Sequence, residues 1–233
     1  GLLLDVMEKF AVHTIFHTAA YKHVPIVEEN ALSALENNVI GTKTTLSAAK
    51  KSGVSRFVLI STDKAVRPTN VMGATKRFAE LILQDFSTSG SSLICSMVRF
   101  GNVIGSSGSV VPKFRDQIEK GGPVTVTHPD VTRYFMTIPE AASLVIQAAA
   151  LAKGGEVFVL DMGQQIRILD LAETMIRMSG HKPVLPGETA EGMKIVYCGL
   201  RPGEKMAEEL SIDGKMDRTI HPKIMTVKED KLC

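Results

Sequence analysis

Four consecutive residues at positions 61–64 could carry acid–base chemistry. Ser61 and Thr62 offer hydroxyl groups, Asp63 a carboxylate and Lys64 an ammonium group, so the stretch holds both proton donors and proton acceptors. Residues 57–60 before them form an apolar run of strand length. We therefore expect the cluster at the carboxyl end of a strand, where open α/β sheets bind their ligands. The alternative is a turn-capping Asp63 beside a solvated Lys64.

A second motif begins at Met72, where residues 71–86 repeat apolar side chains at helical spacing. Met72 and Lys76 are four positions apart, so their side chains share one face of a helix. A thioether cannot transfer protons. We therefore expect Met72 to contribute packing, and Lys76 is the residue of this motif that can donate a proton or a hydrogen bond.

The elements that must position these residues follow an alternating pattern. Apolar runs of strand length and composition occupy 14–16, 57–60, 93–98 and 157–160, and segments of helical periodicity occupy 31–51, 71–86, 139–153 and 168–178. Such alternation predicts right-handed crossovers and a mostly parallel sheet. We expect an α/β, doubly wound fold. Residues 101–136 and 161–233 break the pattern, and they are either a lobe over the sheet edge or surface loops.

The composition excludes several classes of protein. The chain has 233 residues, 44% of them hydrophobic, and a formal net charge of +2, which predicts no nucleic-acid partner. No apolar run approaches the roughly 20 residues that span a bilayer. The cysteines, Cys95, Cys198 and Cys233, are widely spaced, as in a reduced, cytoplasmic chain. The six histidines show no metal-binding spacing, so we predict no metal, and we expect His17 and His23 to be local hydrogen-bonding groups.

Five ordered groups of residues resemble the nucleotide-sugar 4,6-dehydratases of polysaccharide biosynthesis, a CapD-like family of extended short-chain dehydrogenases/reductases. They are STDKA (61–65) with MGATK (72–76), HTAAYKHVP (17–25), RFGNVIGSSGSV (99–110), VTVT (124–127) with TRYFM (132–136), and RPGEK (201–205). The resemblance covers roughly residues 1–225. The family of short-chain dehydrogenases carries YxxxK where this chain has Met72 and Lys76. Met in place of Tyr resembles the branch that acts on UDP-N-acetylglucosamine.

The resemblance implies a hydro-lyase reaction with a tightly bound NAD or NADP and retention at carbon 5. Hydride leaves carbon 4 of the hexose, water is eliminated across carbons 5 and 6, and hydride returns to carbon 6. By analogy Lys64 is the base, Asp63 is the acid and Thr62 binds the carbon 4 oxygen, with Met72 and Lys76 completing the catalytic group. Without the Tyr, Asp63 acting through Thr62 or water is our preferred candidate to remove the carbon 4 hydroxyl proton.

The resemblance also implies binding roles for residues in several segments. The expected cofactor contacts are Ala19, Ala20, Lys22, Ser61, Lys76, Val103, Ile104 and Gly105. The expected substrate contacts are Lys22, Asn102, Val110, Thr127, Arg133, Arg201 and Glu204. Alternatives stay open for Lys22, as an exposed loop residue, and for Arg133, as a structural ion pair.

The domains, partners and location are further implications of the resemblance. Residues 1–100 and 137–163 would form an incomplete Rossmann-type dinucleotide-binding domain, and 101–136 and 164–233 a smaller substrate-binding lobe. The glycine-rich turn that holds a pyrophosphate has no counterpart in these 233 residues. We therefore expect part of the sheet only, weak or no cofactor binding by this chain alone, and no dehydration by it. We expect a homo-oligomer acting on UDP-N-acetylglucosamine, on the cytoplasmic side, with no membrane segment in this chain and the full-length protein anchored in the bacterial inner membrane. Its product would serve capsule or lipopolysaccharide biosynthesis.

Two other functions compete with the dehydratase. A nucleotide-sugar 4-epimerase would share the fold and the turn at 99–105, but it needs no elimination acid and base and normally keeps the Tyr. A non-catalytic UDP-sugar-binding module would explain Met72. Asp63 and Lys64 favour the dehydratase over the epimerase, and the non-catalytic module stays open.

Overall fold

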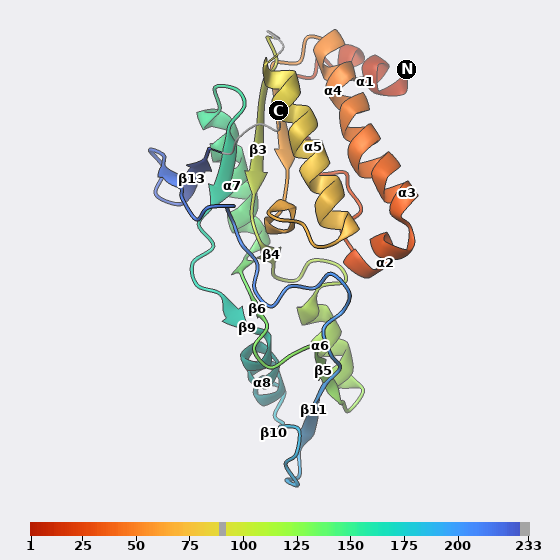
Figure 1. Ribbon diagram of the computed structural model, residues 1–233, viewed down its shortest axis with the longest axis vertical. Helices are drawn as coiled ribbons and strands as arrows, with labels where there is room; N and C mark the ends of the chain where they lie inside the picture. The colour runs from red at the N-terminus through yellow and green to blue at the C-terminus, as the bar shows by residue number, and fades with distance from the viewer. Residues whose placement is uncertain (89–91, 229–233) are drawn as a thin grey trace. The chain divides into compact units, whose positions relative to one another are not determined.

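The structure is a computed structural model that describes residues 1–88 and 92–228, and these divide into two compact units. The first unit contains Gly1–Phe100, Ala141–Asp161 and the chain from Glu209 onward. The second unit contains Gly101–Glu140 and Met162–Glu208. Both can be followed by colour in Figure 1.

A six-stranded sheet in the order β1-β2-β3-β8-β13-β12 organises the first unit. Strands β1 (Thr14–His17), β2 (Arg56–Ile60), β3 (Ile94–Arg99) and β8 (Val157–Leu160) are parallel, and β13 (Ile224–Val227) and β12 (Asp217–Arg218) complete it in antiparallel pairings. The helices are α1 (Leu2–Lys9), α2 (Val24–Glu29), α3 (Ala31–Leu35), α4 (Gly41–Lys51), α5 (Val71–Thr88) and α7 (Ile138–Leu151). Helices α4 and α5 run side by side (Figure 1).

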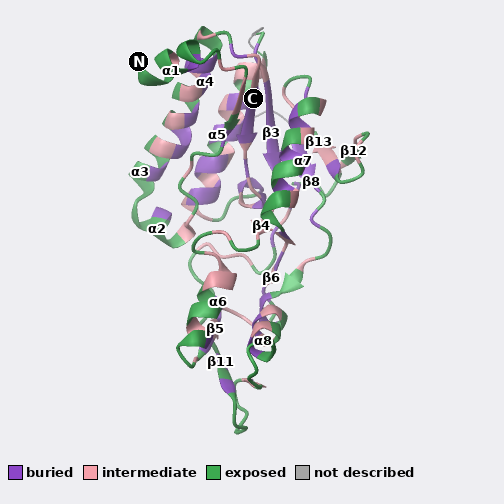
Figure 2. Ribbon diagram, turned by 180° about the vertical axis from the view of Figure 1, so that it is seen from behind, coloured by how far each residue is buried: buried purple, intermediate pink, exposed green. Residues whose placement is uncertain are grey.

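The predicted α/β fold with a parallel sheet is confirmed. Each of the four predicted strands lies within one residue of an observed parallel strand. The three inner runs form strands whose residues are mostly buried because the sheet is covered on both faces, as is usual for parallel sheets, whereas β1 is the end strand and exposes Phe16. In β2, Phe57, Val58 and Leu59 are all buried. Buried residues are concentrated along β3 and α5 in Figure 2.

The segment predicted to be helical at 31–51 is helical but contains an irregular turn. It consists of α3, a π-helical turn η1 (Glu36–Ile40), and α4. Asn38 and Val39 in η1 are buried. π-Turns inside helices redirect side chains and often occur at functional sites, and Asn38 proves to matter below.

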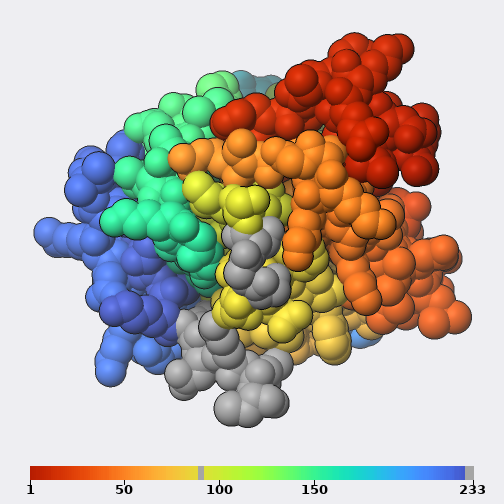
Figure 3. Space-filling view, turned by 90° about the horizontal axis from the view of Figure 1, so that it is seen from above, coloured from red at the N-terminus to blue at the C-terminus, as the bar shows by residue number. Residues whose placement is uncertain are grey.

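One margin of the first unit exposes large apolar side chains. Leu2 and Phe10, in and just after α1, are 80% and 67% exposed, and Phe16 of the end strand β1 is 40% exposed. Figure 3 shows the red N-terminal segment against the orange residues of α4, which α1 contacts.

The second unit has small sheets around its own core. A three-stranded sheet has the order β10-β11-β5, and two further pairs are β4 with β7 and β6 with β9. The strands are β4 (Asn102–Val103), β5 (Val124–Val126), β6 (Thr132–Arg133), β7 (Phe135–Met136), β9 (Ile166–Arg167), β10 (Pro183–Val184) and β11 (Met193–Tyr197). Helices α6 (Val110–Glu119) and α8 (Ile168–Met178) pack on β5 through Phe114, Val126 and Ile176.

The boundary between the units differs by a few residues from the expected limits at 137–140 and 162–163, and by a whole segment near the C-terminus. Residues 164–233 were expected to belong to the lobe, but the described residues from Glu209 onward lie in the first unit. The reason is β13, whose residues Ile224 and Val227 are buried as it pairs with β8. The sequence alone did not predict this strand, and its pairing with β8 shows to which unit it belongs.

Two smaller expectations concern membranes and cysteines. None of the helices in the described part of the chain combines the length and hydrophobicity that crossing a lipid bilayer demands. Cys95 is buried and Cys198 exposed, both as free thiols, and Cys233 lies outside the described residues.

Candidate active site

The predicted catalytic residues form a tight turn directly after β2. Thr62 precedes the short 3₁₀ helix η2 (Asp63–Ala65), and its hydroxyl accepts the Lys64 N–H at 3.4 Å. The same hydroxyl donates to Asp63 Oδ1 at 2.8 Å, and Lys64 Nζ lies 3.0 Å from that oxygen. A threonine hydroxyl and a lysine ammonium therefore converge on one carboxylate oxygen.

The other oxygen of Asp63 has a different environment. The Asp63 side chain is fully buried, and Oδ2 has no hydrogen-bond partner among the residues that the structure describes. A buried carboxylate oxygen without a donor is costly, and such atoms are uncommon in folded proteins. An unsatisfied oxygen beside a hydroxyl and an amine suits a group that exchanges a proton with a bound substrate.

Helix α5 is held close to this turn by a glycine. A Cβ atom at Gly73 would lie 2.3 Å from the carbonyl oxygen of Lys64, so a side chain there would force the helix and the turn apart. Asn70 caps the start of the helix by accepting the Gly73 N–H at 2.8 Å. This close approach lets Lys76, one turn further on, reach the end of β2.

Lys76 is a buried cation at the strand end. Its Nζ donates to the carbonyl oxygen of Ile60 at 2.6 Å. Burial lowers the pKa of Lys76 to about 8, and the charge of Glu80 partly opposes this. The pKa of His17, at the end of β1, is lowered to about 4 by burial and then by the charge of Lys76. The His17 Nε2 lies 3.0 Å from the Thr42 hydroxyl, so His17 is a neutral, locally bonded histidine.

Met72 is a core residue. It is 3% exposed and packs in a cluster with Val27 of α2 and Ala34 of α3. The Met72 side chain therefore stabilises the contact between helices. The next residue on α5, Gly73, is the one that lies against the predicted catalytic turn.

The loop after β1 carries three of the residues expected to bind the cofactor. Ala19 and Lys22 are exposed, and Ala20 is half-buried. Their loop is held by Asn38, which accepts the Tyr21 N–H at 2.7 Å and donates to the Tyr21 carbonyl at 3.0 Å. Small side chains after β1 and a buried ammonium after β2 are compatible with a nicotinamide nucleotide.

Two functionally placed residues were not predicted. Asn38 also donates to the Thr75 hydroxyl of α5 at 3.0 Å, so that it ties the loop to the helix that bears Lys76. Glu80 accepts from Ser61 and Arg99, as described below. Asn38 and Thr75 are far apart in the sequence, so their contact could not be predicted. The π-turn that buries the Asn38 amide is visible only in the structure.

Four of the expected substrate residues come together in the second unit. Glu204 Oε1 accepts from the Thr127 hydroxyl at 3.0 Å and from the Arg133 guanidinium at 3.2 Å. Glu204 Oε2 accepts the backbone N–H of Arg201 at 3.1 Å, which closes the RPGE turn. Arg133 is nearly buried and also donates to the Thr132 carbonyl. The cluster presents the exposed side chain of Arg201 beside a fixed frame of polar groups.

The remaining expected residues lie in the same unit. Asn102 and Val103 form β4 and pair with Phe135 and Met136 of β7. Ile104 is exposed, and Gly105 has a φ of 77°, which only glycine adopts without strain. Val110 begins α6 and is half-buried. The structure thus gathers the catalytic group in the first unit and the substrate group in the second.

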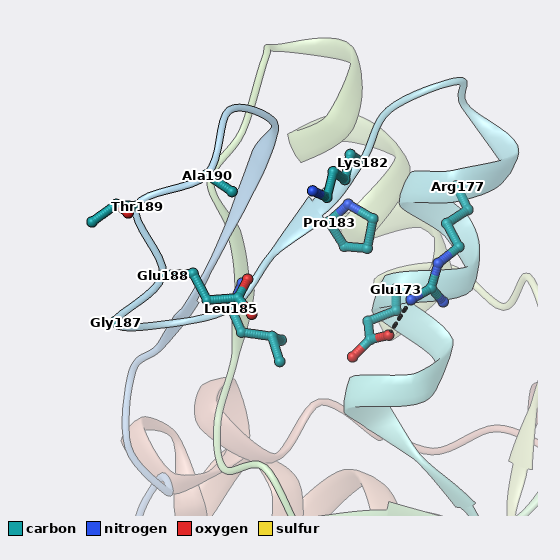
Figure 4. Close-up of a pocket in the computed structure, with 9 residues that line it drawn as sticks. All are labelled: Glu173, Arg177, Lys182, Pro183, Leu185, Gly187, Glu188, Thr189 and Ala190. Carbon is teal, nitrogen blue, oxygen red and sulfur yellow. Dashed lines mark hydrogen bonds and ion pairs between the residues drawn. The ribbon is translucent and has the colours of Figure 1, made fainter.

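A separate hollow lies in the second unit between α8 and residues 182–190 (Figure 4). Arg177 and Glu173 form an ion pair of 2.6 Å on its wall, and none of its lining residues is an expected site residue. In the described part of the chain, no group of three histidine, cysteine or acidic residues could hold a metal ion.

Comparison with known proteins gives this arrangement a family. Residues 2–229 match the family described as "Polysaccharide biosynthesis protein". The chain belongs to this polysaccharide biosynthesis family. The family-level resemblance inferred from the sequence motifs is therefore confirmed. The family assignment agrees with the parallel sheet and with the STDKA motif that follows β2.

Several curated proteins are similar to this chain over most of its length. The capsular polysaccharide biosynthesis protein CapD of Staphylococcus aureus is 56% identical over 208 residues, which are 89% of this chain and 34% of CapD. A UDP-glucose 4-epimerase of Rickettsia rickettsii is 39% identical over 203 residues, 85% of this chain and 56% of that protein. The chain therefore spans about a third of the length of CapD.

Solved structures show the same fold. Pen from Bacillus thuringiensis is 37% identical with a TM-score of 0.86, over 98% of this chain and 70% of that one. DesIV of Streptomyces venezuelae, a dTDP-glucose 4,6-dehydratase solved with NAD bound, is 21% identical with a TM-score of 0.77, over 92% of this chain and 68% of that one. At this identity, the similarity to DesIV supports the fold of this chain and nothing more.

Proposed function

We propose that this chain carries the catalytic residues of a UDP-N-acetylglucosamine 4,6-dehydratase that retains the configuration at carbon 5. The observation that carries the proposal is the buried Asp63, whose Oδ1 contacts both Thr62 and Lys64 and whose Oδ2 has no partner in the described chain. An elimination needs an acid and a base side by side, and this turn supplies both.

The geometry supports a proton relay that replaces the missing tyrosine. The Thr62 hydroxyl donates to Asp63 Oδ1 at 2.8 Å. As hydride leaves carbon 4, Thr62 takes the proton of the carbon 4 hydroxyl and passes its own proton to Asp63. Asp63 is then a neutral acid next to Thr62, and the carbon 4 oxygen becomes a ketone.

The same two residues complete the elimination. Lys64 acts as the general base and removes the proton from carbon 5, which the new ketone has acidified. Asp63 gives the proton that it received from carbon 4 to the carbon 6 hydroxyl, which leaves as water. Lys64 then returns its proton to carbon 5 on the same face, which accounts for retention. The balance is the loss of one water.

A nicotinamide cofactor, NAD or NADP, supplies hydride acceptance at carbon 4 and hydride return to carbon 6. On the protein side, Lys76, whose Nζ donates to the Ile60 carbonyl, would hold a ribose hydroxyl of the cofactor. The small side chains of Ala19 and Ala20 leave room beside β1, and Lys22 and Ser61 border the same strand ends. Met72 fills the space of the absent tyrosine without taking part in proton transfer.

The second unit is proposed to bind the UDP group. Arginine binds diphosphates through its planar fork, which suits the exposed side chain of Arg201. Glu204 is oriented by Thr127 and Arg133 and can accept from ribose hydroxyls. Asn102, Val110 and the turn Val103, Ile104 and Gly105 complete the proposed nucleotide contacts. The product, a 4-keto-6-deoxy sugar, would enter surface polysaccharide, and the protein is proposed to act as a homo-oligomer on the cytoplasmic side of a membrane to which the full-length protein is anchored.

A 4-epimerase is the second candidate because relatives such as the Rickettsia rickettsii protein carry that name at 39% identity. Two features disfavour it for this chain. Met72 occupies the position of a proton-transferring tyrosine, and Asp63 and Lys64 form an acid–base pair that epimerisation does not use.

Mass spectrometry combined with NMR of the sugar separates these functions. The protein that contains this chain is incubated with UDP-N-acetylglucosamine and its cofactor, beside a Lys64→Ala control. A product lighter than the substrate by one water supports the dehydratase. An epimer of unchanged mass supports the epimerase, and binding without any product supports a non-catalytic module.

A further inference from the structure

Helix α5 meets the catalytic segment at three successive turns of the helix. Gly73 lies against the Lys64 carbonyl, Lys76 Nζ donates to the Ile60 carbonyl at 2.6 Å, and Glu80 Oε1 accepts from the Ser61 hydroxyl at 2.6 Å. Lys76 and Glu80 are one turn apart on the same face. They hold neighbouring residues, Ile60 and Ser61, directly before the Thr62–Asp63 pair.

Glu80 is the centre of a buried group of cations. Arg99 at the end of β3 donates to both of its oxygens, Nε to Oε1 at 2.7 Å and Nη2 to Oε2 at 2.6 Å. Arg77 donates to Oε2 at 2.9 Å. The side chains of Glu80 and Arg99 are fully buried, and that of Arg77 is 15% exposed. One carboxylate therefore faces two arginines and the Lys76 ammonium a turn away.

We propose that Glu80 is a positioning residue for the reaction, which holds Ser61 at the end of β2 and keeps the buried Lys76 ammonium charged. The inference rests on the proposed function, in which Ser61 and Lys76 serve the cofactor. The two tasks are separable, because the first uses a hydrogen bond and the second uses a charge.

The charge task follows from which cation can give up its proton. Arginine stays protonated in proteins, whereas a buried lysine readily becomes neutral. If the Glu80 charge is removed, Arg99 and Arg77 remain, so Lys76 is the group that loses its proton. The pKa of Lys76 is already lowered to about 8 by burial, and loss of an adjacent opposite charge lowers a lysine pKa further, by about 1–3 units.

Other charged groups surround Lys76 and stay in place in this test. His17 on β1 interacts electrostatically with Lys76. The neighbouring elements also carry Arg99 at the end of β3 and the Asp63–Lys64 pair of η2, and none of these is changed in Glu80→Gln. His17 is neutral above the lowered pKa of about 4, so it adds no charge near pH 7.

The first measurement is the stability of the protein against pH, which needs neither substrate nor cofactor. Lys76 has a pKa of about 8 when folded and 10.5 as its ordinary value. Its contribution is thus unfavourable below pH 8, and stability rises as pH increases through that value. In Glu80→Gln the rise starts at lower pH. Between about pH 7 and pH 8 the unfolding equilibrium constant of Glu80→Gln should then fall nearly tenfold per pH unit. In the wild type the same constant should change little over this range.

Two matched variants test the assignment from other directions. Ser61→Ala removes the hydrogen bond and keeps the charge, so its pH dependence of stability should parallel that of the wild type. Arg77→Gln removes a partly exposed cation beside Glu80, and it should delay the rise to higher pH, the opposite sign. Arg77→Gln also keeps the proposal testable if Glu80→Gln does not fold.

The second measurement is turnover of UDP-N-acetylglucosamine against pH in the same variants. We expect Glu80→Gln to move the alkaline loss of activity to lower pH. Ser61→Ala should keep the wild-type profile with kcat lower by about 10- to 100-fold, as misplaced reacting groups cause, and an unchanged KM.

The two measurements fail separately. Absence of dehydration by the wild type would overturn the proposed function but leave the stability result standing. Stability curves of Glu80→Gln and Arg77→Gln that parallel the wild type would overturn the charge task of Glu80. An unaltered kcat in Ser61→Ala would overturn the positioning task.

Discussion

Asp63 and Glu80 are both fully buried carboxylates beside cations, yet their environments are opposite. Both oxygens of Glu80 accept two hydrogen bonds, from Ser61, Arg99 and Arg77. Burial alone would raise the pKa of Glu80, but the hydrogen bonds and charge of Arg99, with Ser61 and Arg77, bring it below its ordinary value. Asp63 has two donors on Oδ1 and none on Oδ2 within the described chain.

This difference separates a structural carboxylate from a chemical one. A saturated carboxylate is held ionised and cannot exchange protons, whereas an under-satisfied one is costly to the fold and available to a substrate. Glu204 in the second unit is intermediate, since it is 18% exposed and paired with Arg133 at 3.2 Å. The predictions below concern the surroundings of these three carboxylates and, last, Met72.

The largest effect is expected at the Asp63 pair. Lys64→Ala removes the proposed general base, so the rate of dehydration should fall by about 10²–10⁴. Affinity for the cofactor and the UDP-sugar should stay close to that of the wild type, as calorimetry would measure. Turnover like that of the wild type would refute the role of Lys64.

Asp63→Asn sharpens the comparison because it preserves shape. It should lower the rate as strongly as Lys64→Ala, since an amide cannot supply a proton. Its thermal stability should equal or exceed that of the wild type, because the unsatisfied carboxylate is gone. A large loss of stability would make Asp63 a structural residue like Glu80.

Glu80→Ala should have the converse effect on the fold. It removes the carboxylate that pairs with the buried Arg99, and breaking a buried ion pair by removing one partner costs about 3–5 kcal/mol of unfolding free energy. Chemical denaturation measures the loss, and Arg167→Ala, which breaks an exposed pair with Asp170, serves as the control. Equal stability of the two variants would contradict the contrast between the carboxylates.

Arg201→Ala extends the comparison to the second unit. Arg201 is exposed, so its loss should not affect folding. Binding of the UDP-sugar should weaken by about 2 kcal/mol, the lower end of the range for a charge that becomes buried against its partner. If calorimetry finds the affinity unchanged, Arg201 has no part in binding.

The smallest effect is expected at Met72. Its side chain packs against Val27 and Ala34, and leucine has a similar volume, so Met72→Leu should cost less than about 1.5 kcal/mol of stability. Activity should remain appreciable, because the thioether transfers no proton. Inactivity comparable to that of Lys64→Ala would show that Met72 has a chemical role.

The sequence by itself determined the parallel sheet and the place of the turn that holds Thr62, Asp63 and Lys64. Period and composition mark strands such as 57–60 because local apolar runs are what a buried parallel strand requires. Thr62, Asp63 and Lys64 are adjacent in the chain, so the end of one strand was enough to bring them together.

Only the tertiary structure decided which groups hold that turn in place. Glu80 meets Arg99 and Ser61, and Asn38 meets Tyr21 and Thr75, although nothing in their local sequence marks these partners. Likewise, β13 joins the first unit through its pairing with β8. Local patterns report which surface a segment buries, whereas hydrogen bonds and ion pairs between distant segments depend on how the chain has packed. The proximity of the proposed catalytic residues could therefore be predicted from the sequence, and the contacts that hold them could not.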